Sequence, residues 1–149
     1  METNLESILT RSVVRTFEEL AFLLVDEELD PVQADAEPAA AARVCFAGPH
    51  RGELILCVYG PTVLAAAAQN MLGEFEAPSR EVQMDAMKEL ANVVCGNLLP
   101  LWAGEEAVFD LTPPEAVEVQ DWERADDVMA KVRLGIEAGR VEAFLKVVS

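Results

Sequence analysis

The chain alternates between segments with a helical repeat of apolar residues and segments with the repeat of a strand. Apolar side chains recur at helical spacing in Leu5–Glu28, Val63–Leu72 and the long segment Ser79–Trp102. Strand-like runs fill much of the remainder: Arg43–Ala47, Glu53–Tyr59, Val108–Leu111, Ala116–Val119, Val128–Ile136 and Val141–Val147. This order of helix, two strands, two helices and at least three strands predicts an α+β domain. Its sheet should be mostly antiparallel, with helices packed on it.

Turn-forming residues separate these segments. Gly48–Gly52 predicts a hairpin between the first two strands, and Ala138-Gly139 predicts another near the end of the chain. Pro100 is expected to end or kink the long helix, because proline has no N–H to donate. Two further segments lack periodicity. We expect Asp30–Ala42 to be an acidic surface loop, and Gln120–Asp127 to be a polar connection in which Trp122 covers the core.

The long helix Ser79–Trp102 has two unlike sides. On a wheel of 3.6 residues per turn, one arc is mainly apolar and holds Val82, Ala86, Leu90, Val93, Val94, Asn97 and Leu101. Asp85, Glu89, Asn92 and Gly96 follow one another along the other side, at offsets of 0, 4, 7 and 11 residues. The apolar arc is expected to lie on the core, and the second set, here called the polar line, to face outward. Asn97 lies in the apolar arc and is expected to satisfy a buried backbone group or a dimer contact.

The composition of the polar line is unusual for an exposed helix face. Asn92 and Gly96 are poor helix formers that cost roughly 0.5–1 kcal/mol each relative to Ala. A carboxylate and a carboxamide about one turn apart on a rigid element can grip a partner jointly. The pattern therefore marks Glu89 and Asn92 as candidate functional residues, with Asp85 and Gly96 beside them.

The spacing Asp85-xxx-Glu89-xx-Asn92 resembles the D/S-xxx-E-xx-N motif of the chemotaxis phosphatases CheC, CheX and FliY. In that family a proline follows the motif asparagine after about two dozen residues, and here Pro113 and Pro114 lie close to that spacing. Two-site members repeat Glu-xx-Asn on the first helix. In this chain Glu18 and Glu19 are followed three residues later by Ala21 and Phe22. The resemblance is therefore to the one-site CheX branch, as a single CheX-like domain over residues 1–149.

The resemblance implies a function and a partner. The protein would speed hydrolysis of the aspartyl phosphate of a CheY-like response regulator in a chemotaxis or two-component pathway. Asn92 would position the attacking water and Glu89 would dock to a cation of the regulator. Asp85 would support that contact, and Gly96 would leave room for the regulator. The protein would hold no cofactor of its own, because Mg²⁺ arrives with the regulator, and it would form a homodimer by strand pairing.

Charge and composition exclude several classes of partner. The net charge of −16 argues against nucleic acid and anionic membranes, because an acidic chain cannot replace their counterions. No apolar run has the length of a membrane span, and the first residues lack the apolar segment of a signal peptide. Cys45, Cys57 and Cys95 stand in apolar runs without a CxxC pair, so we expect reduced thiols in a cytoplasmic protein. His50 beside Pro49 is expected to be a solvated turn residue.

Other classes of function remain open from the sequence. The chain could bind a response regulator, a receptor or a motor component without hydrolysing phosphate, or it could be a structural dimerisation module. A metal hydrolase fits poorly, because Asp85 and Glu89 are aligned without a histidine. A nucleophilic hydrolase fits less well still, because no Gly-x-Ser-x-Gly motif is present.

Overall fold

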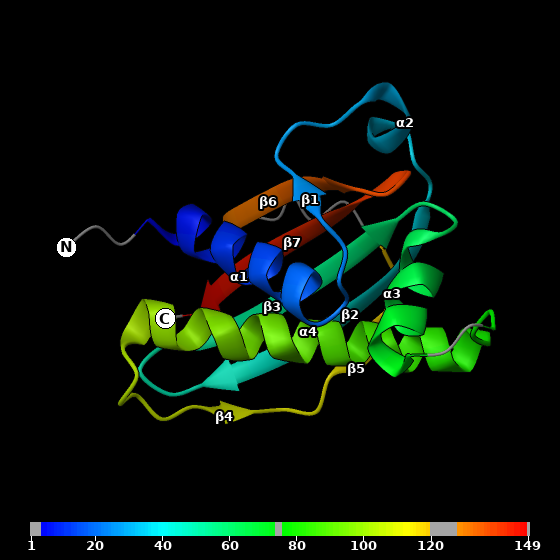
Figure 1. Ribbon diagram of the computed structural model, residues 1–149. Coiled ribbons are helices and arrows are strands. Elements are labelled where there is room, and N and C mark those ends of the chain that lie inside the picture. The colour runs from blue at the N-terminus through cyan, green and yellow to red at the C-terminus, as the bar shows by residue number, and fades with distance from the viewer. Residues whose placement is uncertain (1–3, 74–75, 120–127, 149) are drawn as a thin grey trace.

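The computed structural model describes residues 4–73, 76–119 and 128–148, in which four helices and seven strands are assigned (Figure 1). The predicted polar connection with Trp122 lies outside the described residues. In chain order the elements are α1 (Leu5–Glu19), β1 (Val25–Asp26), α2 (Pro31–Ala34), β2 (Pro38–Ala47), β3 (Arg51–Tyr59), α3 (Val63–Leu72), α4 (Arg80–Ala103), β4 (Asp110–Leu111), β5 (Glu115–Val117), β6 (Val128–Ile136) and β7 (Gly139–Val148).

The described strands form one antiparallel sheet in the order β1-β6-β7-β3-β2-β4, with β5 also paired to β2. The two predicted hairpins are confirmed, since Ala47 pairs with Arg51 and Ile136 pairs with Gly139. The nearly continuous apolar run of β3 is central, between β2 and β7. The predicted α+β fold with a mostly antiparallel sheet is therefore confirmed.

Alternation along the strands divides the buried residues into two groups. On β3, Leu54, Leu56 and Val58 face the main core beneath α1 and α4, whereas Ile55, Cys57 and Tyr59 belong to a smaller cluster on the other face. Figure 1 shows α1 and α4 lying side by side across the near face of the sheet. The long helix is thus fixed on one side by the sheet and on one flank by a second helix.

The first helix is shorter than predicted. Asn4 caps it by accepting hydrogen bonds from the N–H groups of Glu6 and Ser7, but α1 ends at Glu19 instead of Glu28. Phe22 adopts a left-handed backbone with φ 54°, and the N–H of Leu23 donates to the Phe17 carbonyl at 3.0 Å. The apolar stripe therefore continues past the helix because Ala21 and Leu23 still bury their side chains from an extended connection.

The predicted loop Asp30–Ala42 is wrong over most of its length. Asp30 and Gln33 form a reciprocal capping box that starts the short helix α2. The alanine run then enters β2, where residues 40–42 are buried. Alanine carries no strand signal in a sequence, but its small side chain lets α4 pack closely on this part of the sheet.

The predicted start of α4 is confirmed, but its predicted end at Pro100 is wrong. The Ser79 side chain accepts a hydrogen bond from the N–H of Val82 and caps the helix, so the helix begins where the segment Ser79–Trp102 predicted. Pro100 does not end the helix, which continues to Ala103 and ends at Gly104 with φ 96°. The full length of the helix is therefore available as one rigid element.

The other face of the sheet is held to α2 by a buried arginine. Arg140 donates to the carbonyls of Gln33, Ala34 and Ala36 at 2.9–3.2 Å, and its Nε lies 2.7 Å from Glu142. Its guanidinium also stacks 3.8 Å from the centre of the Tyr59 ring, and burial raises the pKa of Tyr59 to about 12. This arginine thus ties α2, the residues just after it and Tyr59 of β3 to β7, while Glu142 on β7 holds its guanidinium in place.

Arg140→Ala should lower the free energy of unfolding by roughly 3–5 kcal/mol, because it leaves the buried Glu142 and three carbonyls short of a partner. Arg133→Ala is the matched control, because Arg133 contacts the same carboxylate at 3.2 Å but its side chain is 45% exposed. It should cost roughly 0–1 kcal/mol. Urea unfolding measures both, and equal losses would contradict the anchoring role of Arg140.

Candidate functional site

The polar line lies on the outward side of α4. Asp85, Glu89 and Gly96 are exposed and Asn92 is half-buried, whereas eight residues of the helix are buried against the core. The buried set is Ala86, Met87, Leu90, Ala91, Val94, Cys95, Leu98 and Leu99. The four predicted site residues are therefore brought together along one accessible face, opposite the packed side of the helix.

The predicted apolar arc is rotated relative to the face that is actually buried. Val82, Val93 and Asn97 are half-buried, and Leu101 is 37% exposed. The helix packs against the sheet and against both α1 and α3. The residues of the predicted arc lie toward a flank that these neighbours cover only in part. This rotation moves the buried face further from the polar line than the sequence predicted.

Asn97 links the two helices that form the site. Its side-chain amide donates to the Thr16 hydroxyl at 3.0 Å, and that hydroxyl donates in turn to the Ser12 carbonyl at 2.7 Å. Its partner is therefore a side chain of α1, and not the buried backbone group that was one of the two expectations. The bond fixes the position of α4 along α1.

Within the described part of the chain, the side chains of Asp85, Glu89 and Asn92 have no hydrogen-bond or ion-pair partner. A Cβ built on Gly96 would meet no atom within 4 Å. The line therefore offers two carboxylates, one carboxamide and an open stretch of helix backbone to a partner.

The corresponding part of α1 is different. Glu19 forms an ion pair with Arg15 at 2.9 Å, Ala21 is buried and Phe22 is 70% exposed. No carboxamide stands three residues after Glu18 or Glu19, so one site per chain stays the prediction.

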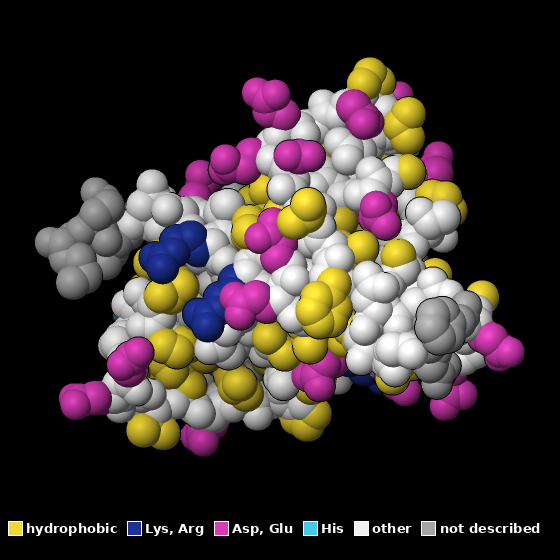
Figure 2. All heavy atoms as spheres, in the orientation of Figure 1, with side chains coloured by type: hydrophobic (Ala, Val, Ile, Leu, Met, Phe, Trp, Pro, Cys, Tyr) yellow, Lys and Arg dark blue, Asp and Glu magenta, His cyan; other side chains and the backbone are white. Residues whose placement is uncertain are grey.

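Figure 2 shows most of the basic side chains on this view gathered over α1, with acidic side chains spread over the rest of the face.

Pro113 and Pro114 connect β4 to β5 at the edge of the sheet, as expected for residues that weaken ladder pairing. The adjacent Thr112 donates its N–H to the Cys45 carbonyl at 3.0 Å, and its hydroxyl accepts from the Cys45 N–H at 3.1 Å. This edge segment contacts α4 through β5.

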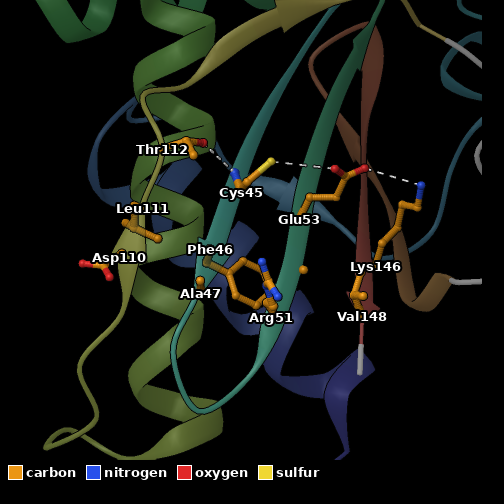
Figure 3. A pocket seen from close by; sticks show the side chains of 11 residues that line it. Cys45, Phe46, Ala47, Arg51, Glu53, Asp110, Leu111, Thr112, Lys146 and Val148 are labelled. Atoms are coloured by element: carbon orange, nitrogen blue, oxygen red, sulfur yellow. Dashed lines mark hydrogen bonds and ion pairs between the residues drawn. The ribbon is translucent and has the colours of Figure 1, made fainter.

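A pocket of about 600 Å³ lies on the face of the sheet opposite the polar line (Figure 3). Its lining includes Cys45, Glu53 and Lys146, which alternate along their strands with the core residues Val44, Leu54 and Leu145. Glu53 pairs with Lys146 at 3.4 Å, and the Cys45 thiol donates to Glu53 at 3.8 Å. These three side chains interact with one another, and the pocket lining includes none of the predicted site residues.

The three cysteines and His50 do not belong to the polar line. Cys45, Cys57 and Cys95 are free thiols, as predicted, and burial raises the pKa of Cys57 and of Cys95 to about 12. His50 lies in the hairpin turn, as expected, but it is half-buried and not merely solvated. Its ring stacks on Trp102 at the end of α4, with centroids 3.9 Å apart and planes 4° from parallel.

The described residues lack two features that other functions would need. They contain no group of three or more His, Cys, Asp or Glu side chains placed to hold a metal ion. No helix within them combines the length and the apolar character that crossing a membrane requires.

Solved structures of chemotaxis proteins share this fold. CheX from Vibrio vulnificus is 16% identical with a TM-score of 0.76 over 97% of each chain. A CheC-like superfamily protein from Shewanella sp. PV-4 is 19% identical with a TM-score of 0.68 over the whole of both chains. A complex of CheX with CheY, BeF3 and Mg²⁺ from Borrelia burgdorferi matches at 12% identity and a TM-score of 0.64, over 99% of this chain and 100% of that one.

At sequence identities of 12–19%, the likeness to these solved structures establishes the fold alone, which is CheX-like. No curated protein matches the chain. The sequence model of the chemotaxis phosphatase CheX family matches residues 40–134, which is more than half of the chain and includes all of α4. The chain therefore belongs to the CheX chemotaxis phosphatase family.

Proposed function

We propose that this protein hydrolyses the aspartyl phosphate of a CheY-like response regulator, using the outward face of α4. The observation that carries the proposal is the accessible row of Asp85, Glu89, Asn92 and Gly96, opposite the packed side of the helix. Membership of a phosphatase family and the likeness to a CheX that was solved with CheY support it.

Asn92 is the residue proposed to act on the reaction. A carboxamide oxygen accepts a hydrogen bond from water while its NH₂ group donates to a phosphoryl oxygen. A water held in this way attacks phosphorus as the bond to the aspartate oxygen breaks, giving phosphate and a free carboxylate. Asn92 exchanges no proton, so its contribution is position and reduced entropy loss. A half-buried side chain on a packed helix suits this role, because its rotamers are restricted before the partner arrives.

Glu89 is proposed to fix the docking register. It lies one turn before Asn92 on α4, roughly 4.5 Å along the helix axis at 1.5 Å per residue. Its exposed carboxylate could pair with a lysine beside the phosphorylated aspartate of the regulator. Asp85 would support the same contact one turn further, and Gly96 would let the backbone of the regulator approach α4 closely.

The charges of the two proteins are expected to complement each other. The chain carries a net charge of −16, whereas the phosphorylation site of a regulator combines a lysine with Mg²⁺. In this proposal the Mg²⁺ arrives bound to the regulator. Binding should accordingly weaken as ionic strength rises.

Two further expectations stay with the proposal. We propose that residues 1–149 act as one CheX-like domain, supported by the packing of the described elements on one sheet. We also propose a homodimer formed by strand pairing. Among the described strands, β1 covers the outer edge of β6 over only two residues, which leaves most of that edge for a second copy.

Asn92→Ala should lower the accelerated decay of the phosphorylated regulator about 100-fold, equivalent to roughly 2.7 kcal/mol of transition-state stabilisation. Asn92→Asp should be as poor, because a carboxylate of similar size repels the phosphoryl group. The measurement is loss of phosphate from a panel of CheY-like regulators in Mg²⁺.

Glu89→Ala should weaken binding more than it slows decay at saturation, and Glu81→Gln is the control for a charge lost elsewhere on α4. Binding of a regulator without any acceleration by the wild type would replace the phosphatase with a non-catalytic binding module. Unchanged decay in Asn92→Ala would contradict the role of that residue.

Gly96→Ala should raise the free energy of unfolding by about 0.5–1 kcal/mol, because alanine favours helix and the site is open. Gly52→Ala is the contrast, since its Cβ would lie 1.9 Å from the Lys146 carbonyl oxygen and should destabilise the sheet. Gly96→Leu should keep a stable fold and weaken regulator binding at least about 10-fold by filling the proposed contact. Full binding by Gly96→Leu would show that the regulator does not approach there.

The dimer predicts a sedimenting species of twice the chain mass at micromolar concentration, with slow amide exchange along the outer edge of β6. Sedimentation equilibrium over a hundredfold concentration range measures the first property and hydrogen exchange the second. A monomer throughout that range would contradict the dimer and leave the proposed chemistry unaffected.

A further inference from the structure

The connection between α1 and β1 presents two large apolar side chains to solvent. Phe22 is 70% exposed and Leu24 is 81% exposed. Ala21, which precedes Phe22, and Leu23, which lies between the two, are buried. Figure 2 shows hydrophobic side chains standing on the surface over this connection.

The backbone around Phe22 is held in place on both sides. The Ala21 carbonyl accepts a hydrogen bond from the Asn70 side chain of α3 at 2.7 Å, and the Leu23 N–H donates to the Phe17 carbonyl at 3.0 Å. Between them Phe22 has φ 54°, a left-handed conformation that is rare for an aromatic residue. A bulky side chain in a disfavoured conformation that gains little burial in return is typical of functional positions.

This connection lies beside the polar line. Thr16 of α1 contacts Asn97 of α4, and the two helices run in opposite directions along each other (Figure 1). Phe22 follows Thr16 by six residues, and the residue six positions before Asn97 lies between Glu89 and Asn92. Because the helices are antiparallel, Phe22 is therefore near the level of Glu89 and Asn92 along α4. A protein seated on the polar line therefore meets the α1–β1 connection at its edge.

We propose that Phe22 and Leu24 form an apolar anchor for the response regulator that docks on the polar line of α4. The inference rests on the proposed function. The occupant is the regulator, because Phe22 follows the end of α1 that packs along the part of α4 carrying the polar line. Leu24 adjoins Val25, which pairs with Ile136 at the edge of β6, so a second copy of the chain is the competing outcome of the test. Acidic contacts alone are screened by salt, and an aromatic anchor supplies affinity that salt does not remove.

The anchor lies outside residues 40–134, the part that matches the CheX family model. The family match therefore gives no account of these two exposed side chains. A regulator with an apolar surface beside its phosphorylation site would be preferred over one whose surface there is charged.

Phe22→Asn is the decisive variant, because asparagine tolerates the left-handed backbone while it removes the apolar ring. It should raise the Kd for a CheY-like regulator activated with BeF3 and Mg²⁺ by roughly 10-fold to 100-fold. The rate of decay at saturating protein should stay within about twofold of wild type, since the anchor does not touch the phosphoryl group. The Tm should be no lower than that of wild type, which separates lost docking from lost folding. Phe22→Trp should retain binding.

Val108→Asn is the matched control, because Val108 is 80% exposed beyond the other end of α4. It should bind like wild type. Wild-type affinity of Phe22→Asn would overturn the anchor and leave the α4 proposal standing. A changed sedimentation coefficient of Phe22→Asn without regulator would assign the patch to self-association and also overturn it. Failure of the wild type to bind any regulator of the panel would remove the proposed function and the anchor together.

Discussion

The rotational setting of α4 on the sheet is the constraint on which the rest of the structure depends. Its buried side, centred on Leu90, Val94 and Leu98, fixes which residues can face outward. The Asn97–Thr16 hydrogen bond then fixes the helix along α1. Because a helix presents opposite sides at once, packing that buries one side holds Glu89 and Asn92 on the other with little freedom left to lose. Stability of the core and readiness of the candidate site are thus consequences of the same contacts.

Much of this arrangement could be predicted because periodicity reports burial directly. The hairpin of β6 and β7, the limits of α3 and the outward position of the polar line all follow from alternation, helical repeat and turn residues. The end of α1 could not be predicted, because Ala21 and Leu23 bury themselves equally well from an extended segment. The alanines that begin β2 carried no strand signal. The stacking of His50 on Trp102 joins residues far apart in the sequence, which no local pattern reveals.

A protein substrate explains why the candidate site lies on the outer side of α4 and not in the pocket on the opposite face of the sheet. A small molecule needs a concave site, whereas a phosphorylated protein can bring its own cleft, metal and lysine to a convex helix. The chain then has to supply only a carboxamide, a docking carboxylate and enough contact area to hold the partner. The exposed Phe22, just beyond the end of α1, offers such contact area beside the polar line, although its backbone conformation is disfavoured.

The most direct test of the account is a crystal structure of this protein bound to a CheY-like regulator carrying BeF3 and Mg²⁺ in place of the phosphoryl group. The account predicts that the Asn92 side chain lies within hydrogen-bonding distance of the beryllofluoride or of a water in line with it. It also predicts that Glu89 contacts the lysine of the regulator. A complex in which the regulator docks elsewhere, with Asn92 still facing solvent, would contradict the claim that α4 carries the chemistry.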